Sequence, residues 1–286
     1  MTSVGCVVLS MGNRPGELAA ALESVLSQQG VEVECLVVGN GWVPVDLPAN
    51  VRSVALTENA GVTAARNVGA AEVTGDILFF LDDDAVLPER DVLARAVAAF
   101  DADSRLGVLQ LAAVDPVGAA TGSRHVPRLG GRGHATPGDV PVFWEGASLI
   151  RRTAFEAVGE WPGEFFYGHE GIEVAWRMID LGYRVHYAAD LPVLNPAAEA
   201  FRGDQHAYLN ARNRVWVARR NLPVLLVAGY TAVWAIATLI RAVPRRVVGQ
   251  VARGFRDGFR LPCGPRRPIS WRTAWRLTLL GRPPVV

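Results

Sequence analysis

Three consecutive aspartates, Asp82, Asp83 and Asp84, follow directly on the apolar run 77–81. Five apolar residues that end in charge predict a buried strand of an α/β sheet, and open α/β sheets bind ligands at the carboxyl ends of their strands. Because like charges repel one another, a compensating cation is expected close by. Asp82 and Asp84 lie on the same side of an extended chain and offer hard oxygen ligands to Mg²⁺ or Mn²⁺, ions that often share substrate phosphates. The feature predicts metal-assisted chemistry on a phosphate-bearing substrate, with an acidic surface turn as the alternative.

Strand and helix patterns alternate through the first part of the chain. Helical periodicity separates most of the strand-like runs, which predicts βαβ units in a mostly parallel central sheet with helices on both faces. The Gly-, Pro-, Arg- and His-rich segment 116–141 has no period and is expected to be a long surface loop. The strand-like runs are 4–9, 33–38, 51–56, 77–81, 106–114, 143–150 and 184–188, and the helical ones are 15–29, 60–71, 91–100, 152–158 and 170–181.

Charge divides the chain into two unequal parts. Residues 1–204 contain 14 Arg against 27 Asp and Glu, whereas residues 205–286 contain 15 Arg and one acid, Asp257. We therefore expect a catalytic domain over 1–204 and an Arg-rich helical tail over 205–286, which faces a polyanion or a membrane. The chain has no Lys, for which a GC-rich coding bias is sufficient explanation. Cys6 and Cys35 fall in expected buried strands, so we expect a reducing compartment and no disulfide framework.

The tail contains three helical patterns. Residues 207–220 form one, and residues 222–240 carry no charge for 19 residues, a length that marginally spans a bilayer core. Val248, Val251, Phe255 and Phe259 then recur at helical spacing among arginines, as in a basic amphipathic helix at a membrane surface.

Four blocks of sequence resemble family 2 glycosyltransferases, which are inverting, metal-dependent enzymes that use nucleotide sugars. In order they are 7–10 (Val-Val-Leu-Ser) with 21–26, 58–69 (Glu-Asn-Ala-Gly-Val-Thr-Ala-Ala-Arg-Asn-Val-Gly), 81–84 (Leu-Asp-Asp-Asp) and 159–177. The resemblance covers roughly residues 4–220. It implies a single Rossmann-like domain of the glycosyltransferase A type.

The second block also has an interpretation of its own. Asn59 and Gly61 are typical of a turn that leads into a helix, and the N-terminus of a helix favours anions. Arg66 is always charged, so it either steadies the aspartates or a diphosphate, or makes only a structural ion pair. In similar enzymes this block closes over the nucleotide, which we carry over to Asn59, Gly61, Arg66 and Asn67.

The resemblance also implies roles for the acids. Asp82 would contact the nucleoside, and Asp84 would hold the Mg²⁺ or Mn²⁺ that bridges the diphosphate. Inverting transfer requires a base for the acceptor hydroxyl, and Glu170 is our candidate because aromatic residues precede it at the mouth of a helix. Relatives usually carry a second acid next to it, at the position of Gly171. Glu173 is the other candidate, although a salt bridge to Arg177 one turn later is the more favoured role.

Five further positions have two interpretations each. His169 is either a second metal or diphosphate ligand or a structural residue. Asn40 stands where relatives place a base-binding Asp, so it either alters nucleotide preference or caps its strand. Gly146, after Trp144, either lets sugar and acceptor approach the backbone or forms a tight turn; Trp144 and Trp161 either stack on sugars or fill the core. The expected donor-binding set is Ser10, Asn40, Asn59, Gly61, Arg66, Asn67, Asp82, Asp83 and Gly146, and the expected metal ligands are Asp82, Asp84 and His169.

We therefore expect an inverting glycosyltransferase that moves a sugar from a nucleoside diphosphate to a hydroxyl of a lipid-linked or cell-envelope glycan. A single span at 222–240 would leave about ten Arg outside, against the positive-inside rule. We expect attachment to the inner leaflet of the cytoplasmic membrane instead, with a true span or a buried helix as alternatives. No nucleic acid is expected as a partner. The rival functions are a nucleotidyltransferase and a non-catalytic nucleotide-sugar or polyanion-binding scaffold.

Overall fold

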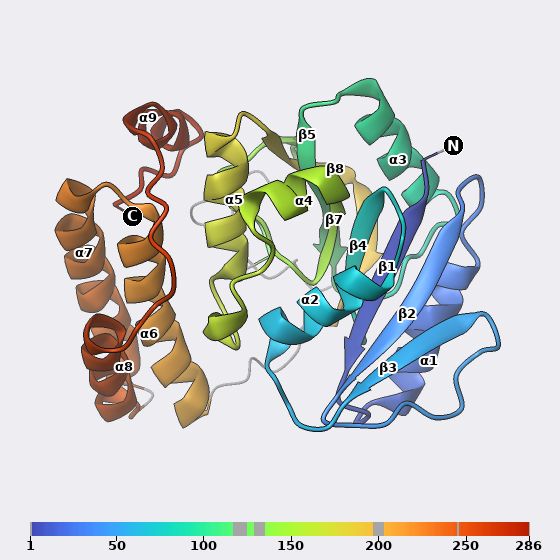
Figure 1. Cartoon of the computed structure of the whole chain (residues 1–286), viewed down its shortest axis with the longest axis horizontal. Helices are drawn as coiled ribbons and strands as arrows, with labels where there is room; N and C mark the ends of the chain where they lie inside the picture. The colour runs from blue at the N-terminus through green and yellow to red at the C-terminus, as the bar shows by residue number, and fades with distance from the viewer. Residues whose placement is uncertain (1, 117–124, 129–134, 197–202, 245, 286) are drawn as a thin grey trace.

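One mixed sheet forms the centre of the molecule (Figure 1). The computed structural model describes residues 2–116, 125–128, 135–196, 203–244 and 246–285. The described strands form the order β3-β2-β1-β4-β7-β5-β8-β6. Much of the segment 116–141 that we expect to be a loop, 117–124 and 129–134, lies outside the described residues.

The N-terminal half of the sheet is parallel. β1 (Val4–Ser10) pairs in parallel with β2 (Val33–Asn40) and β4 (Ile77–Asp82), and β2 pairs with β3 (Val51–Leu56). The inner strands of this half are largely buried and apolar, whereas the edge strand β3 is partly exposed. On one face of the whole sheet lie α1 (Pro15–Leu26) and α3 (Val92–Ala102). On the other face lie α2 (Val62–Glu72), α4 (Arg152–Val158) and α5 (Glu170–Asp180).

The second half of the sheet mixes directions. β7 (Ala147–Arg151) is antiparallel to both β4 and β5 (Leu106–Val114), β5 is parallel to β8 (Arg184–Leu194), and the short β6 (Gly138–Asp139) is antiparallel to β8. The expectation of a mostly parallel α/β sheet is confirmed. The expected strand 143–150 is wrong in its first half, because Trp144 donates its backbone N–H to the Gln110 side chain and residues 143–146 turn away from the ladder.

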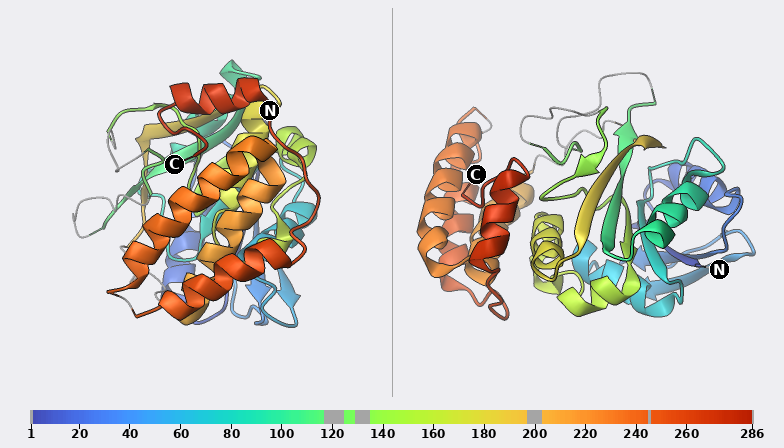
Figure 2. Two further views of the ribbon diagram at one scale, coloured as in Figure 1. Left: turned by 90° about the vertical axis from the view of Figure 1, so that its left-hand side faces the viewer. Right: turned by 90° about the horizontal axis from the view of Figure 1, so that it is seen from above.

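The tail forms a helical layer beside α5, at the end of the molecule opposite β3 (Figure 2). Its helices are α6 (Asp204–Asn221), α7 (Val224–Ala242), α8 (Val248–Arg260) and α9 (Trp271–Leu279). Trp216, Val217 and Leu222 of this layer belong to the same apolar core as Trp176 of α5. The sequence patterns do not predict α9, which begins after Ser270. The hydroxyl of Ser270 accepts the backbone N–H of Thr273 and caps the helix.

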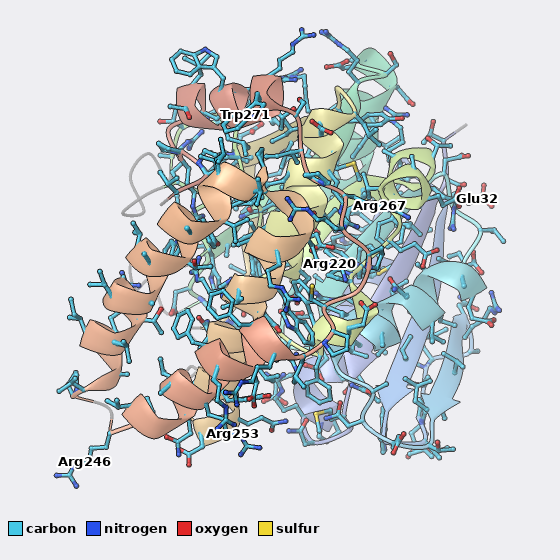
Figure 3. The ribbon with its side chains drawn as sticks, turned by 60° about the vertical axis from the view of Figure 1, so that its left-hand side comes forward. Glu32, Arg220, Arg246, Arg253, Arg267 and Trp271 are labelled. Atoms are coloured by element: carbon cyan, nitrogen blue, oxygen red, sulfur yellow. The ribbon has the colours of Figure 1, made fainter. Side chains whose placement is uncertain are left out.

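An extended strap, residues 261–270, crosses α6 and reaches the end of α5. The N–H groups of Arg267 and Ile269 donate to the carbonyls of Arg220 and Asn221, each at 2.8 Å. The N–H of Ser270 donates to Asp180 at the end of α5. Figure 3 shows the strap, which carries Arg267, crossing α6 close to Arg220. The tail is therefore a structural continuation of the domain.

Two further expectations concern the cysteines and the apolar tail segment. Cys6 and Cys35 are buried in strands, as expected, and Cys263 is buried as well; all three are free. Within the described residues α7 is the helix long and apolar enough to cross a membrane by length and composition, and 17% of its most apolar 18-residue window is buried. A core helix of a soluble domain would be mostly buried, so α7 presents an unusually large apolar surface.

Candidate active site

Two arginines compensate the three aspartates at the carboxyl end of β4. Arg66 on α2 donates to Asp82 at 2.8 Å. Arg14, at the start of α1, donates to Asp83 at 2.6 Å and also to Asp84. The sequence predicts a cation near these acids, and in this structure guanidinium groups supply it. Arg14 was not among the predicted site residues, although it lies in the loop after β1, the strand that pairs with β4.

The three carboxylates differ in exposure, which divides their roles. Asp83 is buried and also accepts a hydrogen bond from the hydroxyl of Ser10 at 2.7 Å, so Ser10 and Asp83 form the buried base of the site. The side chain of Asp82 is 35% exposed, against 10% for Asp84. Burial raises the pKa of Asp83, and burial together with the charge of Asp82 raises the pKa of Asp84. Asp82 is therefore the most exposed of the three acids.

Asn40 builds the turn that opens the second sequence block. Its amide donates to the side chain of Asn59 at 2.9 Å and accepts the backbone N–H of Ala60 at 2.8 Å. Asn59 in turn accepts the N–H of Gly61. Because Asn40 is buried and both ends of its amide are engaged, the strand-capping interpretation describes its contacts.

Two glycines allow close approaches around the site. Gly61 has φ +85°, and a Cβ there would lie 2.6 Å from the backbone of Phe166. Gly146 accepts the N–H of Asp82 at 2.8 Å, and a Cβ on it would lie 2.2 Å from the Asp82 carboxylate. Gly146 therefore makes room for Asp82, and Gly61 brings α2 against the segment before Glu170.

Segment 163–169 leads directly into Glu170, and hydrogen bonds from α2 and from the tail hold it in place. Phe166 and His169 both have positive φ, at 65° and 73°, conformations that non-glycine residues adopt only when surrounding contacts hold them. From α2, Val62 donates its N–H to Phe166 O at 2.6 Å, and the Thr63 hydroxyl donates to Gly163 O at 3.1 Å. These contacts fix the entry to α5.

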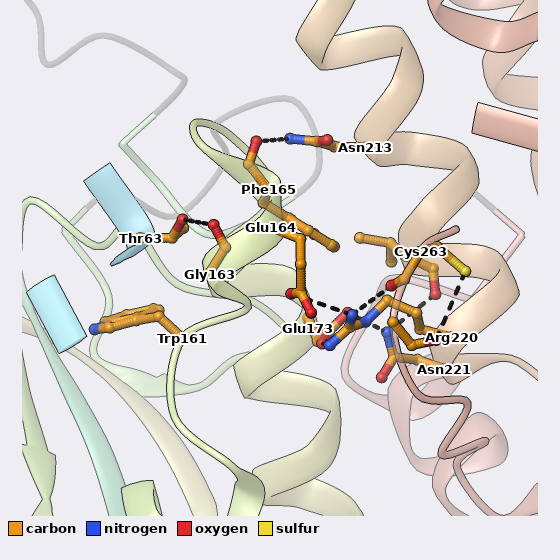
Figure 4. A network of polar contacts seen from close by, with 12 residues as sticks. Thr63, Trp161, Gly163, Glu164, Phe165, Glu173, Asn213, Arg220, Asn221 and Cys263 are labelled. Carbon is orange, nitrogen blue, oxygen red and sulfur yellow. Dashed lines mark hydrogen bonds and ion pairs between the residues drawn. The ribbon is translucent and has the colours of Figure 1, made fainter. Parts of the chain in front are cut away.

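The second grip on this segment comes from the tail. The side-chain amide of Asn213 on α6 is fully buried and lies within 2.8–3.0 Å of the carbonyls of Phe165, Tyr167 and Gly168. Figure 4 shows the contact to Phe165. Asn213 was not predicted as a site residue, and it makes the tail part of the active-site scaffold.

Glu170 has the environment of a general base. It is 3% exposed, lies at the first position of α5, and its Oε2 has no hydrogen-bond partner among the described residues. Burial raises its pKa, with Arg66 opposing and Asp82 adding to the rise. A buried carboxylate with a raised pKa is better matched to accept a proton near neutral pH than an ordinary Glu.

Glu173 is committed to holding α5 against α6. Its fully buried carboxylate pairs with Arg177 and Arg220, each at 2.8 Å, and accepts the side-chain amide of Asn221 at 2.7 Å (Figure 4). The expected salt bridge to Arg177 is confirmed. Removing one partner of a buried ion pair typically costs about 3–5 kcal/mol, so this cluster stabilises the tail on the domain.

His169 faces the tail. Its Nε2 lies 3.2 Å from Oδ1 of Asn210 on α6, and burial and the charge of Arg214 lower its pKa. In the described part of the chain no group of three or more His, Cys, Asp and Glu side chains converges on a metal position. The structure therefore does not bring His169 together with Asp82 and Asp84 as a ready ligand set.

The remaining predicted residues, Asn67, Trp161 and Trp144, make their described contacts within the protein. Asn67 exchanges two hydrogen bonds with the backbone of Trp161, and Trp161 packs in the core against Phe80 and Phe155. Trp144 stacks on His125 at a centroid distance of 4.4 Å. Trp161 therefore fills the core. Both ends of the Asn67 amide pair with the backbone of Trp161, and these contacts position α2.

The fold is similar to that of solved glycosyltransferases. The structure is similar to a mannosyltransferase, PcManGT from Pyrobaculum calidifontis, solved with GDP-Man and Mn²⁺ (TM-score 0.59, 18% identity, 97% of this chain and 79% of that one). It is also similar to GalNAc-T7 solved with UDP, GalNAc and Mn²⁺ (0.63, 14%, 91% and 56%) and to residues 1–349 of S. aureus TarS (0.58, 16%, 90% and 89%). No curated protein matches the chain in sequence. These likenesses define a glycosyltransferase A-type fold.

The family follows from the sequence. The profile of glycosyl transferase family 2 matches residues 6–159, just over half of the chain, so the chain belongs to this family. The matched region runs from β1 to the end of α4 and includes the aspartates, Arg14, Arg66 and Gly146. It ends before Glu170, so the assignment of the base depends on the geometry above.

Proposed function

We propose that the chain is an inverting glycosyltransferase that moves a sugar from a nucleoside diphosphate to an acceptor hydroxyl. The observation that carries the proposal is electrostatic: Asp82, Arg66 and Glu170, from β4, α2 and α5, form one interacting group beside Asp84. An ionised base and an acid cluster for a phosphate-bound cation are the two components that such transfer requires.

The carboxylates at the end of β4 are the type of ligand that a divalent cation prefers. Asp84 and Asp82 offer hard oxygen atoms, and their crowding, seen in the raised pKa of Asp84, is relieved by positive charge. Asp84 would hold Mg²⁺ or Mn²⁺ with the help of Asp82, and the ion would act as a Lewis acid on the departing diphosphate. The side chain of Arg14 is 40% exposed beside Asp84, so it lies where it can also pair with the diphosphate.

The chain's own residues account for the proton. Glu170 accepts the proton of the acceptor hydroxyl while the hydroxyl oxygen forms its bond to the anomeric carbon. The bond from that carbon to the diphosphate oxygen breaks on the opposite face, so the configuration inverts. Arg66 balances the charge of Asp82 next to Glu170 throughout, and the grip of Asn213 and Thr63 on segment 163–169 fixes the position of the base.

The experiment that tests this function is a panel of nucleotide sugars incubated with the whole chain. We expect release of nucleoside diphosphate from at least one donor, and the release should require Mg²⁺ or Mn²⁺. The anomeric configuration of the product, read by NMR, should be opposite to that of the donor. Metal-independent release or retained configuration would contradict the mechanism, and release of pyrophosphate would indicate a nucleotidyltransferase.

We further propose that the tail attaches the enzyme to an anionic membrane surface, where a lipid-linked or cell-envelope glycan is the acceptor. Two helices carry apolar residues on the outside. On α7, Val224, Leu225, Ile236 and Ile240 are 62–78% exposed. On α9, Trp271, Trp275 and Leu279 recur at every fourth position and are 56–70% exposed. Figure 3 shows Trp271 pointing away from the protein at the start of α9.

The positive charge of the tail indicates that these helices bind a negatively charged membrane surface. Residues 205–286 contain 15 Arg against one acid, and exposed apolar residues flanked by Arg are typical of helices that lie in the headgroup region of anionic lipid. The apolar length of α7 and its low burial support partial insertion of this helix.

A vesicle-binding measurement tests the attachment. We expect the whole chain to sediment with phosphatidylglycerol vesicles at physiological salt and much less with phosphatidylcholine vesicles. The double variant W271S/W275S should bind about tenfold more weakly, because two interfacial aromatic anchors are lost. The matched control is V43S/V45S, which removes exposed apolar residues outside the tail. A wild-type protein that stays in the supernatant with anionic vesicles would contradict the attachment.

A further inference from the structure

One face of α6 lies along the loop before α5, and a buried arginine belongs to that face. His206, Asn210 and Arg214 recur at every fourth position of α6, so their side chains share one side of the helix. The ring of His206 lies 5.5 Å from that of Tyr167, and Nε2 of His169 lies 3.2 Å from Oδ1 of Asn210. His206 and Asn210 are partly exposed, so this face is open to solvent at one end and buried at Arg214.

The guanidinium of Arg214 is buried without an acidic partner. Arg214 is 9% exposed, and its guanidinium carbon lies 3.3 Å from the ring centroid of Trp234 on α7. One terminal nitrogen donates to the hydroxyl of Tyr230 at 3.2 Å. The Nε atom is buried and has no hydrogen-bond partner in the described part of the chain. An aromatic ring and a neutral hydroxyl therefore hold a full positive charge away from water, which is unfavourable unless an anion pairs with it.

A second arginine adds positive charge at the same place. The guanidinium carbon of Arg282, after α9, lies 6.0 Å from the centroid of the same Trp234 ring. Two like charges around one ring raise the cost of burying Arg214, and a ligand of opposite charge offsets that cost. A guanidinium suits phosphate in particular, because its planar fork can donate to two phosphate oxygens at once. The chemistry of this cluster therefore fits a phosphate group.

The position of Arg214 indicates which substrate carries that phosphate. α6 lies on the side of α5 away from the sheet (Figures 1 and 2), whereas Arg14 and Arg66 pair with the aspartates at the end of β4. The diphosphate of the donor is proposed to bind at the β4 end. In an inverting displacement the acceptor approaches the anomeric carbon from the face opposite to the departing diphosphate. The α6 side of the base is therefore the side of the acceptor.

The aromatic partners of Arg214 connect this cluster to the proposed membrane surface. Trp234 and Tyr230 both belong to α7, the helix that exposes a large apolar surface. A phosphate held between α6 and α7 would lie where the headgroup region of a membrane meets the protein. A phosphate that is attached to a lipid fits this position better than one on a freely soluble sugar.

We propose that Arg214, with Arg282 beside it, binds a phosphate group of the acceptor, so that the acceptor is a lipid-linked glycan phosphate. This inference depends on the proposed function, because the proposed transfer defines the side from which the acceptor approaches. Arg214 is a binding residue: it holds the acceptor so that the hydroxyl lies next to Glu170, and it takes no part in the proton transfer.

Titration of inorganic phosphate tests the site without turnover. The whole chain is first saturated with nucleoside diphosphate and Mg²⁺ to fill the donor site, and phosphate is then added in a calorimeter. We expect wild type to bind phosphate and Arg214→Gln to bind it at least about tenfold more weakly, because charge-assisted hydrogen bonds are lost. Arg282→Gln, a second variant that leaves α6 unchanged, should bind it about threefold more weakly. Arg105→Gln is the control, since that side chain is 75% exposed.

Two results of this titration would overturn the inference. One is equal phosphate binding by wild type, Arg214→Gln and Arg282→Gln, or no binding by any of them. The other is phosphate binding by wild type that nucleoside diphosphate abolishes, because Arg214 would then serve the diphosphate of the donor.

A pair of acceptors tests the substrate class with a donor that the nucleotide-sugar panel identifies. Transfer to a sugar on a short-chain prenyl diphosphate is compared with transfer to the neutral alkyl glycoside of the same sugar. Wild type should prefer the phosphate-bearing acceptor by about tenfold or more in kcat/KM, and Arg214→Gln should lose this preference. A preference that survives in Arg214→Gln would overturn the inference. Phosphate binding as expected, with no transfer to either acceptor, would contradict the proposed function and leave the phosphate site standing.

Discussion

Replacement of Glu170 by Gln is expected to lower the rate constant of sugar transfer by about 10³-fold, within the range usual for loss of a general base. Gln keeps the shape of the side chain but does not accept the proton of the acceptor hydroxyl. Since the base acts on the acceptor, the Kd of the nucleoside diphosphate should change little. Steady-state transfer and calorimetric titration of the nucleotide with metal measure the two quantities separately.

The pH profile gives the same prediction a second measurement. In the proposed mechanism Glu170 accepts the proton in its ionised form, so the wild-type rate should fall as the pH drops through its pKa. Because burial raises the pKa of Glu170, this fall should begin at a higher pH than for an ordinary Glu, which ionises near about 4.3. Glu156→Gln is the matched control, and its profile should coincide with wild type. Full transfer by Glu170→Gln would show that another group is the base.

The position of the site, and part of its chemistry, could be predicted from local patterns. The apolar run before Asp82 specifies a buried strand wherever the chain places it, and the carboxyl end of such a strand is a ligand site by topology. Glu170 was chosen because the resemblance to family 2 glycosyltransferases implies a base, and because a helix start after aromatic residues is visible within a few residues of sequence. The strand and the helix start need only neighbours in sequence, which is why both agree with the fold, whereas the role of Glu170 stays a prediction.

The supporting contacts could not be predicted, because they join residues that are far apart in the chain. Arg14 reaches Asp83 across 69 positions, and Asn213 reaches Tyr167 across 46. Glu145 meets Gly171 only because β7 inserts antiparallel next to β4, a direction that the alternation of strands and helices does not reveal. An arginine, an asparagine or a glutamate in a loop has many possible partners, and only the tertiary fold selects one.

Polar residues within the matched motifs have partners inside the protein. Asn40 and Asn67 are predicted donor-binding residues, and their described amide contacts are to backbone and turn groups. A buried amide must pair both its donor and its acceptor, and backbone groups close by in a turn or a helix start are the nearest partners. Their described contacts therefore shape the site, whereas Asp82 keeps a partly exposed carboxylate.

Replacement of Asp84 by Ala is expected to reduce metal-dependent transfer by about 10²-fold or more, since a Lewis acid at a departing phosphate is worth several kcal/mol. Titration of Mn²⁺ in the presence of nucleoside diphosphate should show weaker metal binding by this variant. The fold should be retained, because Arg14 still pairs with Asp83 and the mutual repulsion of the acids is reduced.

The control for this variant is Asp101→Ala, which removes an exposed aspartate whose carboxylate accepts only the hydroxyl of Thr2 among the described contacts. Its metal response should equal that of wild type. If Asp84→Ala kept both the wild-type Mn²⁺ affinity and the wild-type rate, the cation would have to be held elsewhere. The paired guanidinium of Arg14 would then be the charge that stabilises the leaving diphosphate, and Arg14→Ala, not Asp84→Ala, would be the variant that stops transfer.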